Sequence, residues 1–343
     1  MNPYSINYHY NITSIVAIAP TVDQYQPGDH SVEISDVNYL LIHGSNDQDV
    51  SFMMGEKQYD NIDFTPFGEE DYFKASVYIM GANHGQFNEL WGRYDIMPAA
   101  NGFLNTANFI EEYEQKLIAK AYIRVFLDTT LNGDDTYASL MYDNERYLSY
   151  LPETIYITNY MDSSFVRCCA FDDYLYSEGL VKVNCYGMSN AHAHKDVYGT
   201  SGEAENYVLM CRWNEGSEPV AKIEFEETDL SSGIISFRIA DMREDAEINT
   251  PLYYEVVLSD DYGNEVSAVC PVLIYPSLAV QLYKEDVLFN CFEYKHQMGT
   301  VRVSTSLFEG DENFDFTSVD GIFIYFDGSS EGSVIIDDIG YYE

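Results

Sequence analysis

Three apolar runs in the first part of the chain constrain the fold more than any other sequence feature. Residues 12–20, 38–43 and 75–80 are predominantly apolar and lack the alternation of a strand that faces water on one side. Continuous runs of this length suit strands buried on both faces, as in a parallel sheet. Residues 51–62 have helical spacing between the second and third runs. The first part of the chain is therefore predicted to be an α/β unit.

A longer helix is predicted after the third run. Asn108 and Glu111 have the spacing of a capping box, and Asn132-Gly133 is a plausible stop. Between them lies an apolar stripe at i, i+4 spacing, made of Phe109, Tyr113, Leu117, Ala121 and Val125. We expect this stripe to cover one face of the sheet.

An aspartate and a histidine follow two of these runs. Asp47 lies in the turn after residues 38–43, and His84 lies in the loop after residues 75–80. Because the carboxyl ends of neighbouring parallel strands meet at one sheet edge, the two side chains are expected to meet there. An aspartate that orients a histidine forms the acid and base of a Ser-His-Asp triad. Asp47 is the predicted acid, with Asp49 as runner-up, and His84 is the predicted base.

The nucleophile of such a triad has no counterpart in this chain. In this chain order the serine precedes the aspartate, on a Gly-x-Ser-x-Gly turn between a strand and a helix. No segment before Asp47 supplies that turn, and the one match, Gly328 to Gly332, lies after His84 between two short β segments. We interpret this match as a Gly/Ser hairpin turn. The chain alone is therefore expected to be inactive, because a histidine without its nucleophile gives at best weak general-base catalysis.

The pattern of secondary-structure signals in the sequence changes near residue 154. Short segments rich in β-branched and aromatic residues, beginning with 154–158, alternate with turn clusters, and Asp261 to Asn264 has the composition of a hairpin turn. Many short strands without a long helical pattern indicate a β-sandwich. The predicted fold class is α/β plus all-β, with a partial α/β sheet in residues 1–140 and a β-sandwich or jelly roll in residues 154–343.

The charge of the chain restricts its partners. Seventeen Lys and Arg stand against 57 Asp and Glu, and the net charge is −40. Such a field repels phosphate backbones and anionic lipids, so nucleic acid and membrane surfaces are not expected as partners. A neutral polysaccharide or an uncharged ester is compatible with it. The sequence does not determine the cellular location of the protein, although a secreted or cell-surface location is favoured over the cytoplasm.

Residues 12–132 resemble the carboxyl-terminal part of an α/β-hydrolase of the dienelactone-hydrolase and platelet-activating-factor-acetylhydrolase-like group. The resemblance rests on three segments, which are 15–20, 43–50 and 82–92. It implies that the three apolar runs are the last three strands of a larger sheet, with Asp47 and His84 as triad members. It also implies a parent activity of serine-dependent hydrolysis of a carboxylic ester. Because the earlier strands have no counterpart, the chain is expected to hold only a piece of such an enzyme.

The last stretch of the chain resembles a different family. Residues 300–304, 321–326 and 334–340 are similar to the final strands of galactose-binding-like jelly rolls, as in carbohydrate-binding modules. Such domains bind glycans in some proteins and are purely structural in others. The alternative to the esterase hypothesis is therefore a carbohydrate-binding or structural sandwich, with the hydrolase-like part as scaffold.

Metal-binding and cysteine patterns are weak. His192-Ala-His194 has no third ligand in view and is predicted to be a polar loop. Asp311, Asn313 and Asp315 have calcium-loop spacing but lack the later glutamate of an EF-hand, which leaves a structural calcium ion open. No other cofactor is predicted.

The cysteines are predicted to be free thiols. All six follow residue 160 and none forms a C-x-x-C pair, although the sequence also allows one or two disulfides.

Overall fold

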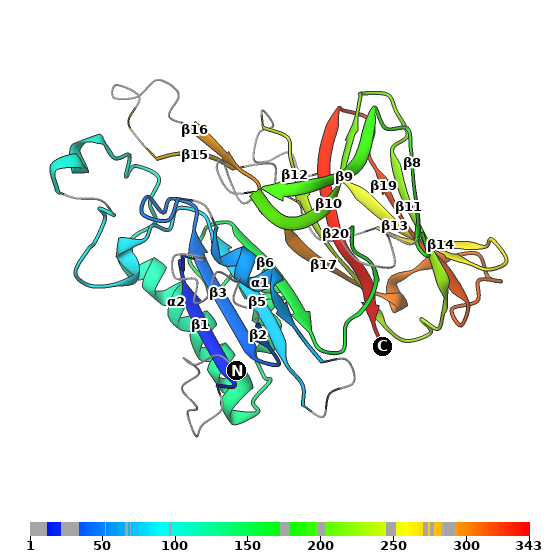
Figure 1. Ribbon diagram of the computed structural model, residues 1–343, viewed down its shortest axis with the longest axis horizontal. Coiled ribbons are helices and arrows are strands. Elements are labelled where there is room, and N and C mark those ends of the chain that lie inside the picture. The colour runs from blue at the N-terminus through cyan, green and yellow to red at the C-terminus, as the bar shows by residue number, and fades with distance from the viewer. Residues whose placement is uncertain are drawn as a thin grey trace, which may run out of the picture.

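The computed structural model describes residues 12–21, 34–51, 53–65, 68, 70–95, 98–171, 179–197, 203–244, 252–269, 274, 278–282, 284 and 292–343. These residues form two packed units (Figure 1). A four-stranded sheet with its helices lies on the left of that view, and a two-layer β-sandwich lies on the right. None of the described helices is long and apolar enough to cross a membrane.

The four-stranded sheet confirms the parallel strands predicted from the apolar runs. Strands β1 (Ser14–Ile18), β3 (Asn38–Gly44) and β5 (Phe73–Ile79) pair in parallel. Every residue of β3 and β5 is buried, which explains why neither run alternates. The fourth strand, β6 (Tyr156–Asp162), pairs antiparallel with β5. The segment 154–158, expected to begin the sandwich, thus leads into this sheet, while the division at residues 140 and 154 stays a prediction.

Helices and a hairpin cover the two faces of this sheet. The helix α2 (Glu112–Leu127) packs on one face through Ile118, Tyr122 and Phe126. The other face receives α1 (Gly55–Asp60) and the hairpin of β15 (Leu278–Gln281) and β16 (Phe292–Lys295). This hairpin belongs to the second part of the sequence, and it extends over the end of β3 (Figure 1). The remaining short elements are β2 (Ile34–Ser35), β4 (Ile62–Asp63), η1 (Gly85–Phe87), η2 (Pro98–Phe103), η3 (Asp128–Asn132), η4 (Ala138–Met141), η5 (Asn144–Tyr147) and η6 (Thr305–Leu307).

The predicted buried face of α2 is wrong in its first half, whereas Ala121 and Val125 of the predicted stripe are partly buried against the sheet core. Tyr113 and Leu117 are 69% and 48% exposed. The buried positions are Gln115, Ile118, Ala119, Tyr122 and Phe126. The helix is apolar on two adjacent sides, so spacing alone could not choose between them. The capping box is also shifted, because the backbone N–H of Glu111 donates to the Glu114 carboxylate.

The β-sandwich confirms the all-β prediction for the second part of the chain. The first layer, named here the β20 sheet, has the order β17 (Gly299–Ser304), β12 (Ile234–Asp241), β20 (Gly332–Tyr342), β10 (Glu203–Trp213) and β9 (Asn190–Val197), with β7 (Val166–Cys169) also paired to β20. The second layer, the β19 sheet, has the order β18 (Glu309–Gly310), β14 (Glu265–Val269), β13 (Tyr254–Asp260), β19 (Val319–Phe326), β11 (Val220–Thr228) and β8 (Lys182–Tyr186).

Alternating side chains of the two layers form the largest core. Ile235, Phe237 and Ile239 of β12 point inward against Val256 and Leu258 of β13, as expected for two sheets packed face to face. The predicted turn at residues 261–264 joins β13 and β14 as a hairpin. Asp260 stabilises it, because its carboxylate accepts hydrogen bonds from the backbone N–H groups of Tyr262 and Asn264.

A buried arginine joins the two units. Arg238 of β12 is only 2% exposed, and its guanidinium donates to Glu56 at 2.6 Å and Asp60 at 2.7 Å, both on α1. It also donates to Asp338, 3.3 Å away on β20. Burial alone would lower the pKa of Arg238, but these carboxylates raise it well above its usual value.

Asp338 reaches this arginine because β20 is irregular there. Its φ of 48° is left-handed, and the register between β12 and β20 shifts at this position. The carboxylate is then held from two sides, since Arg167 Nη2 of β7 lies 2.9 Å from its other oxygen. Burial by itself would raise the pKa of Asp338, but Arg167 and Arg238 lower it below its usual value.

We expect Arg238→Met to lower the free energy of unfolding by about 3–5 kcal/mol, because it would leave buried carboxylates without their counter-charge. Chemical denaturation followed by circular dichroism measures this change. The control is Arg124→Met, which removes an exposed pair with Asp128 and should leave the denaturation midpoint nearly unchanged. Equal midpoints for the two variants would show that the Arg238 network does not hold the units together.

Candidate functional site

Asp47 and His84 meet at the carboxyl edge of the parallel strands. Asp47 lies in the turn after β3, and His84 lies in the loop after β5. His84 Nδ1 is 2.8 Å from Asp47 Oδ2, so the imidazole donates a hydrogen bond to the carboxylate. The expected meeting of the two side chains is thus found, while their catalytic roles stay a prediction.

Local hydrogen bonds fix the Asp47 carboxylate. The side chain is fully buried, and its Oδ1 accepts from the backbone N–H groups of Asp49 at 3.0 Å and Val50 at 2.7 Å. Its Oδ2 is thereby left for His84. The hydrogen bond that His84 donates to Asp47 raises the pKa of His84, despite the opposing effect of partial burial. Asp49 Oδ2 lies 3.8 Å from the other ring nitrogen, Nε2, so the runner-up acid does not occupy the position behind Nδ1.

The two turns pack so closely that glycine is required. A Cβ atom on Gly44 would lie 2.3 Å from the carbonyl oxygen of Ala82. Without it, the Asn46 N–H donates to the same carbonyl at 2.9 Å. From the other side, Gln115 of α2 exchanges two hydrogen bonds with the backbone of Asn83, at 3.1 and 2.6 Å. This contact explains why α2 turns a polar residue toward the sheet.

Asp95 holds the two loops together, and the sequence analysis missed it. Its carboxylate accepts hydrogen bonds from the backbone N–H groups of Gln48, His84 and Gly85, at 3.2, 3.0 and 2.7 Å. Burial raises the pKa of this carboxyl, although these hydrogen bonds oppose the shift. No motif surrounds Asp95, so only its contacts identify it. Trp91, in the same loop, stacks on the His84 ring at 5.4 Å between centroids.

A segment from the second part of the chain also holds the Asp47 turn. The carbonyl of Leu282, just after β15, accepts from Gln48 Nε2 at 2.8 Å and from the Asn105 N–H at 3.0 Å. The Lys295 ammonium at the end of β16 donates to the carbonyl of Ser51. The geometry of the aspartate turn therefore depends on residues more than two hundred positions away in the sequence.

The Asp47–His84 pair can accept a proton, but the described residues supply no nucleophile to it. The His84 side chain is 19% exposed, so the pair is not sealed from solvent. Among the described residues, no serine hydroxyl hydrogen-bonds to Nε2. The nearby His43 is structural, because burial lowers its pKa to about 4 and its Nε2 donates to the carbonyl of Val50.

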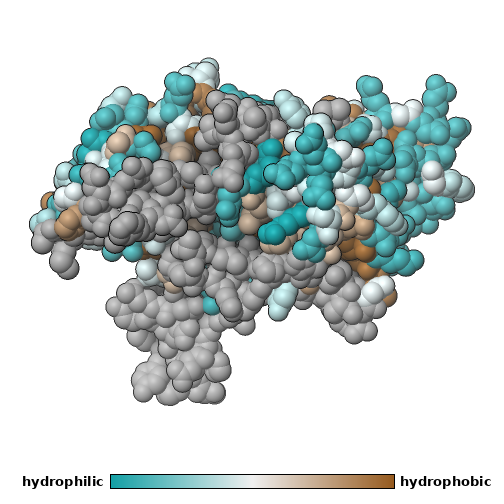
Figure 2. Space-filling view, turned by 90° about the horizontal axis from the view of Figure 1, so that it is seen from above, coloured by the Kyte–Doolittle hydropathy of each residue, from teal (hydrophilic) through white to brown (hydrophobic). Residues whose placement is uncertain are grey.

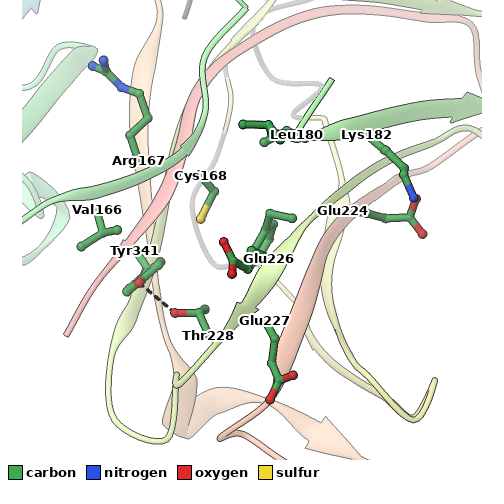
Figure 3. Close-up of a pocket in the computed structure, with 12 residues that line it drawn as sticks. Val166, Arg167, Cys168, Leu180, Lys182, Glu224, Glu226, Glu227, Thr228 and Tyr341 are labelled. Carbon is green, nitrogen blue, oxygen red and sulfur yellow. Dashed lines mark hydrogen bonds between the residues drawn. The ribbon is translucent and has the colours of Figure 1, made fainter. Parts of the chain in front are cut away.

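A cavity of about 630 Å³ lies at one edge of the sandwich (Figure 3). It opens between β7 and β20 of one layer and β8 and β11 of the other. Its lining residues are Val166, Arg167, Cys168, Leu180, Val181, Lys182, Glu224, Phe225, Glu226, Glu227, Thr228 and Tyr341. The sequence analysis did not single out these residues, because they come from four segments that only the folded chain brings together.

Both charged and apolar side chains line this cavity. Tyr341 and Thr228 share a hydrogen bond of 2.9 Å across one end. Glu226 and Glu227 leave β11 in opposite directions in Figure 3, and the Glu226 carboxylate points toward Cys168. Burial raises the pKa of the Cys168 thiol to about 12, so this cysteine does not provide a thiolate nucleophile at neutral pH.

The remaining motifs take structural positions. His192 and His194 lie in β9, opposite Met210 and Val208, so the predicted polar loop is wrong and its residues form a strand. Their side chains lie outside the described part of the structure. Asp311 and Asp315 accept hydrogen bonds from the backbone N–H groups of Asn313 and Thr317, which is typical of Asx turns. In the described ranges, no group of three or more acidic, histidine or cysteine side chains could hold a metal ion.

The Gly-x-Ser-x-Gly match lies in a turn between the two layers. It follows β19 of one sheet and leads into β20 of the other, so the predicted hairpin tip is a crossing between sheets. Ser329 donates both its backbone N–H and its hydroxyl to Asp327. No helix follows this serine, unlike the arrangement that a nucleophile turn requires.

Comparison with known proteins gives matches to solved structures alone. No protein-family model matches the chain, and no curated protein matches its sequence. A family 11 carbohydrate-binding module of the cellulase Lic26A-Cel5E of Clostridium thermocellum is similar at 12% identity and a TM-score of 0.32, covering 52% of this chain and 94% of the module. An exo-β-agarase has 13% identity and a TM-score of 0.33, covering 51% and 24%. A family 30 module of the cellulase Cel9D-Cel44B of Clostridium thermocellum has 12% identity and a TM-score of 0.29, covering 45% and 91%.

The expected membership of the α/β-hydrolase family is wrong. The structural neighbours are carbohydrate-binding modules and parts of glycoside hydrolases, and α/β-hydrolases are not among them. The physical basis of the misleading resemblance is local. Three parallel strands with polar turns at their carboxyl ends occur in this chain, but an antiparallel strand closes the sheet and most of the chain forms a β-sandwich.

Proposed function

We propose that the sandwich binds a neutral polysaccharide in the cavity between β7, β8, β11 and β20. The observation that carries this proposal is the composition of the cavity, which is lined by carboxylate, ammonium and hydroxyl groups together with apolar side chains. A sugar ring presents hydroxyl groups at its rim and C–H groups on its faces. A cavity that offers both kinds of surface, within the usual volume range of ligand sites, suits such a ligand.

The polar groups of the cavity can form hydrogen bonds with the neighbouring hydroxyl groups of a sugar. A carboxylate such as that of Glu226 accepts two hydrogen bonds, and the Lys182 ammonium donates up to three. Hydrogen bonds to charged groups are stronger than those between neutral groups, so a few of them can orient a sugar in water. Val166, Leu180 and other apolar residues of the lining can contact its C–H faces.

The charge of the protein favours a neutral glycan over an anionic one. The net charge of −40 would repel sulfated or uronic-acid polymers, and three glutamates line the cavity itself. Hydrophilic side chains cover much of the described surface of the sandwich when it is seen from above (Figure 2). The proposal places the protein in a secreted or cell-surface setting, where it would meet extracellular polysaccharides.

We expect Glu226→Ala to weaken binding to the recognised polysaccharide by about 10–100-fold, because it removes a charged hydrogen-bond acceptor worth about 1.5–3 kcal/mol. Affinity electrophoresis in gels that contain xylan, mixed-linkage β-glucan, agarose or soluble cellulose derivatives measures the retardation. The control is Glu312→Ala, which removes an equal charge from an exposed turn outside the cavity.

Two results would contradict this proposal. The first is that none of the neutral polymers retards the protein. The second is that Glu226→Ala and Glu312→Ala are retarded equally, which would place any binding outside this cavity.

A second candidate function is hydrolysis of an uncharged ester at the Asp47–His84 pair. The specific observation is the 2.8 Å contact between Asp47 Oδ2 and His84 Nδ1, on a histidine side chain that is 19% exposed. In this arrangement Nε2 would take a proton from a water molecule as it attacks the ester, while Asp47 stabilises the imidazolium. With no nucleophile bound to Nε2 among the described residues, the rate would be slow and no acyl-enzyme would accumulate.

We expect Asp47→Asn to lower the pKa of His84, because it replaces the carboxylate that raises that pKa. Nuclear magnetic resonance titration of the imidazole protons of His84 measures the change. Because the pKa of His84 is higher in the folded state than in the unfolded state, protonated His84 stabilises the fold. This stabilisation is complete below the unfolded-state pKa of about 6.5 and is lost as the pH rises through the folded-state pKa. Asp47→Asn should therefore destabilise the protein more at pH 5 than at pH 9.

Slow hydrolysis of p-nitrophenyl acetate, without a burst phase, is the matching kinetic expectation. His84→Gln should remove it, because glutamine cannot accept the proton. If His84 titrates identically in the wild type and in Asp47→Asn, the two side chains are not coupled in solution and this candidate function fails.

A further inference from the structure

We infer that Cys185 and Cys211 form a disulfide between the two layers of the sandwich when the protein meets a low-molecular-weight disulfide such as oxidised glutathione. Cys185 lies on β8, the last strand of the β19 sheet, and Cys211 lies on β10 of the β20 sheet. Both thiols are free in this structure. The bond would therefore link the two layers of the sandwich covalently.

The two side chains point into the same core. Cys211 is fully buried within the sandwich core, and Cys185 packs against that core while remaining partly exposed. Their strand neighbours confirm the inward direction, because Ala221 lies opposite Cys185, Val334 lies opposite Cys211, and both belong to the core. A hydrogen bond joins the two thiols, so the sulfur atoms already face each other across the interface.

The chemistry assigns a different role to each thiol. The hydrogen bond from Cys211 lowers the pKa of Cys185, and Cys185 is the more accessible of the two. The Cys185 thiolate would attack one sulfur of the small disulfide and release one thiol. The Cys211 sulfur would then displace the second thiol from Cys185. Two protein thiols are thus oxidised to one disulfide, and one small disulfide is reduced to two thiols.

The two cysteines of β7, Cys168 and Cys169, belong to the same core but are less suited to oxidation. Burial raises the pKa of Cys168 to about 12, and its neighbour Cys169 is fully buried. Neither is partly exposed as Cys185 is. Oxidation should therefore select the pair on β8 and β10.

The disulfide would stabilise an edge of the sandwich. It closes the segment 186–210 into a loop and so reduces the freedom of the unfolded chain. The strand β8 pairs with β11 on one side only, and it contributes Lys182 to the cavity. The inference does not depend on whether that cavity binds a polysaccharide.

The test incubates the folded chain with oxidised glutathione, blocks remaining thiols with iodoacetamide and maps the peptides by mass spectrometry. We expect a peptide pair linked through Cys185 and Cys211, and a midpoint of thermal unfolding about 5 °C or more above that of the reduced protein. In Cys185→Ser the linked pair and the rise in midpoint should both be lost. In Cys168→Ser, the matched control, both should remain.

Three results would overturn the inference. One is alkylation of both thiols in the folded wild type after full incubation. Another is a link between Cys185 or Cys211 and a different cysteine. The third is a rise in midpoint that persists in Cys185→Ser. The mapping uses the wild type, so it decides the matter even if a variant fails to fold.

Discussion

The buried charge of Arg238 is the interaction on which the arrangement of the two units depends. An isolated guanidinium in the protein interior would be strongly unfavourable. It therefore requires carboxylates from the elements that pack around it. Glu56 and Asp60 come from the helix of one unit, and Asp338 comes from a bulge in the sandwich. Because the charges balance only when α1 lies against this face of the β20 sheet, the network specifies one docking geometry.

Weaker polar contacts surround this network and reinforce it. Asn159 of β6 donates to Glu56, and Thr300 of β17 accepts from the Tyr160 backbone N–H. The Lys74 ammonium is buried beneath α1 and donates to the carbonyls of Tyr59 and Ile62. Burial lowers the pKa of Lys74 to about 8, although nearby carboxylates oppose the shift. These hydrogen bonds have fixed directions, so they restrict how the two units can pack against each other.

Fixing the two units has a consequence for the Asp47–His84 pair. The hairpin of β15 and β16 leaves the sandwich between β14 and β17 and reaches the turn that carries Asp47. Its contacts through Leu282 and Lys295 are possible only when the sandwich is docked as observed. The pair is therefore supported by both units, whereas the cavity with Glu226 lies wholly within the sandwich. The two proposed functions are physically separable for this reason.

Local patterning in the sequence determined several parts of this structure. The unbroken apolar runs of β3 and β5 required burial on both faces, which a parallel sheet provides. That sheet in turn required the residues after its strands to meet at one edge, so the proximity of Asp47 and His84 followed from their positions in the chain. Many short segments of β-branched and aromatic residues, separated by turn clusters, likewise indicated a β-sandwich, because such strands are too short and too numerous for a helical unit.

Tertiary structure decided the rest, because it depends on contacts between distant segments. The hydrogen bonds between Gln115 and the backbone of Asn83 determine which face of α2 points toward the sheet. The strand β6 joins this sheet because it pairs with the free edge of β5. The role of Asp95 and the lining of the sandwich cavity have no local signature. The resemblance to α/β-hydrolases failed for the same reason, since it rested on short segments that fix local geometry but not the architecture around them. A strand's own residues determine which of its faces are buried, but its partners are determined by the chain that folds against it.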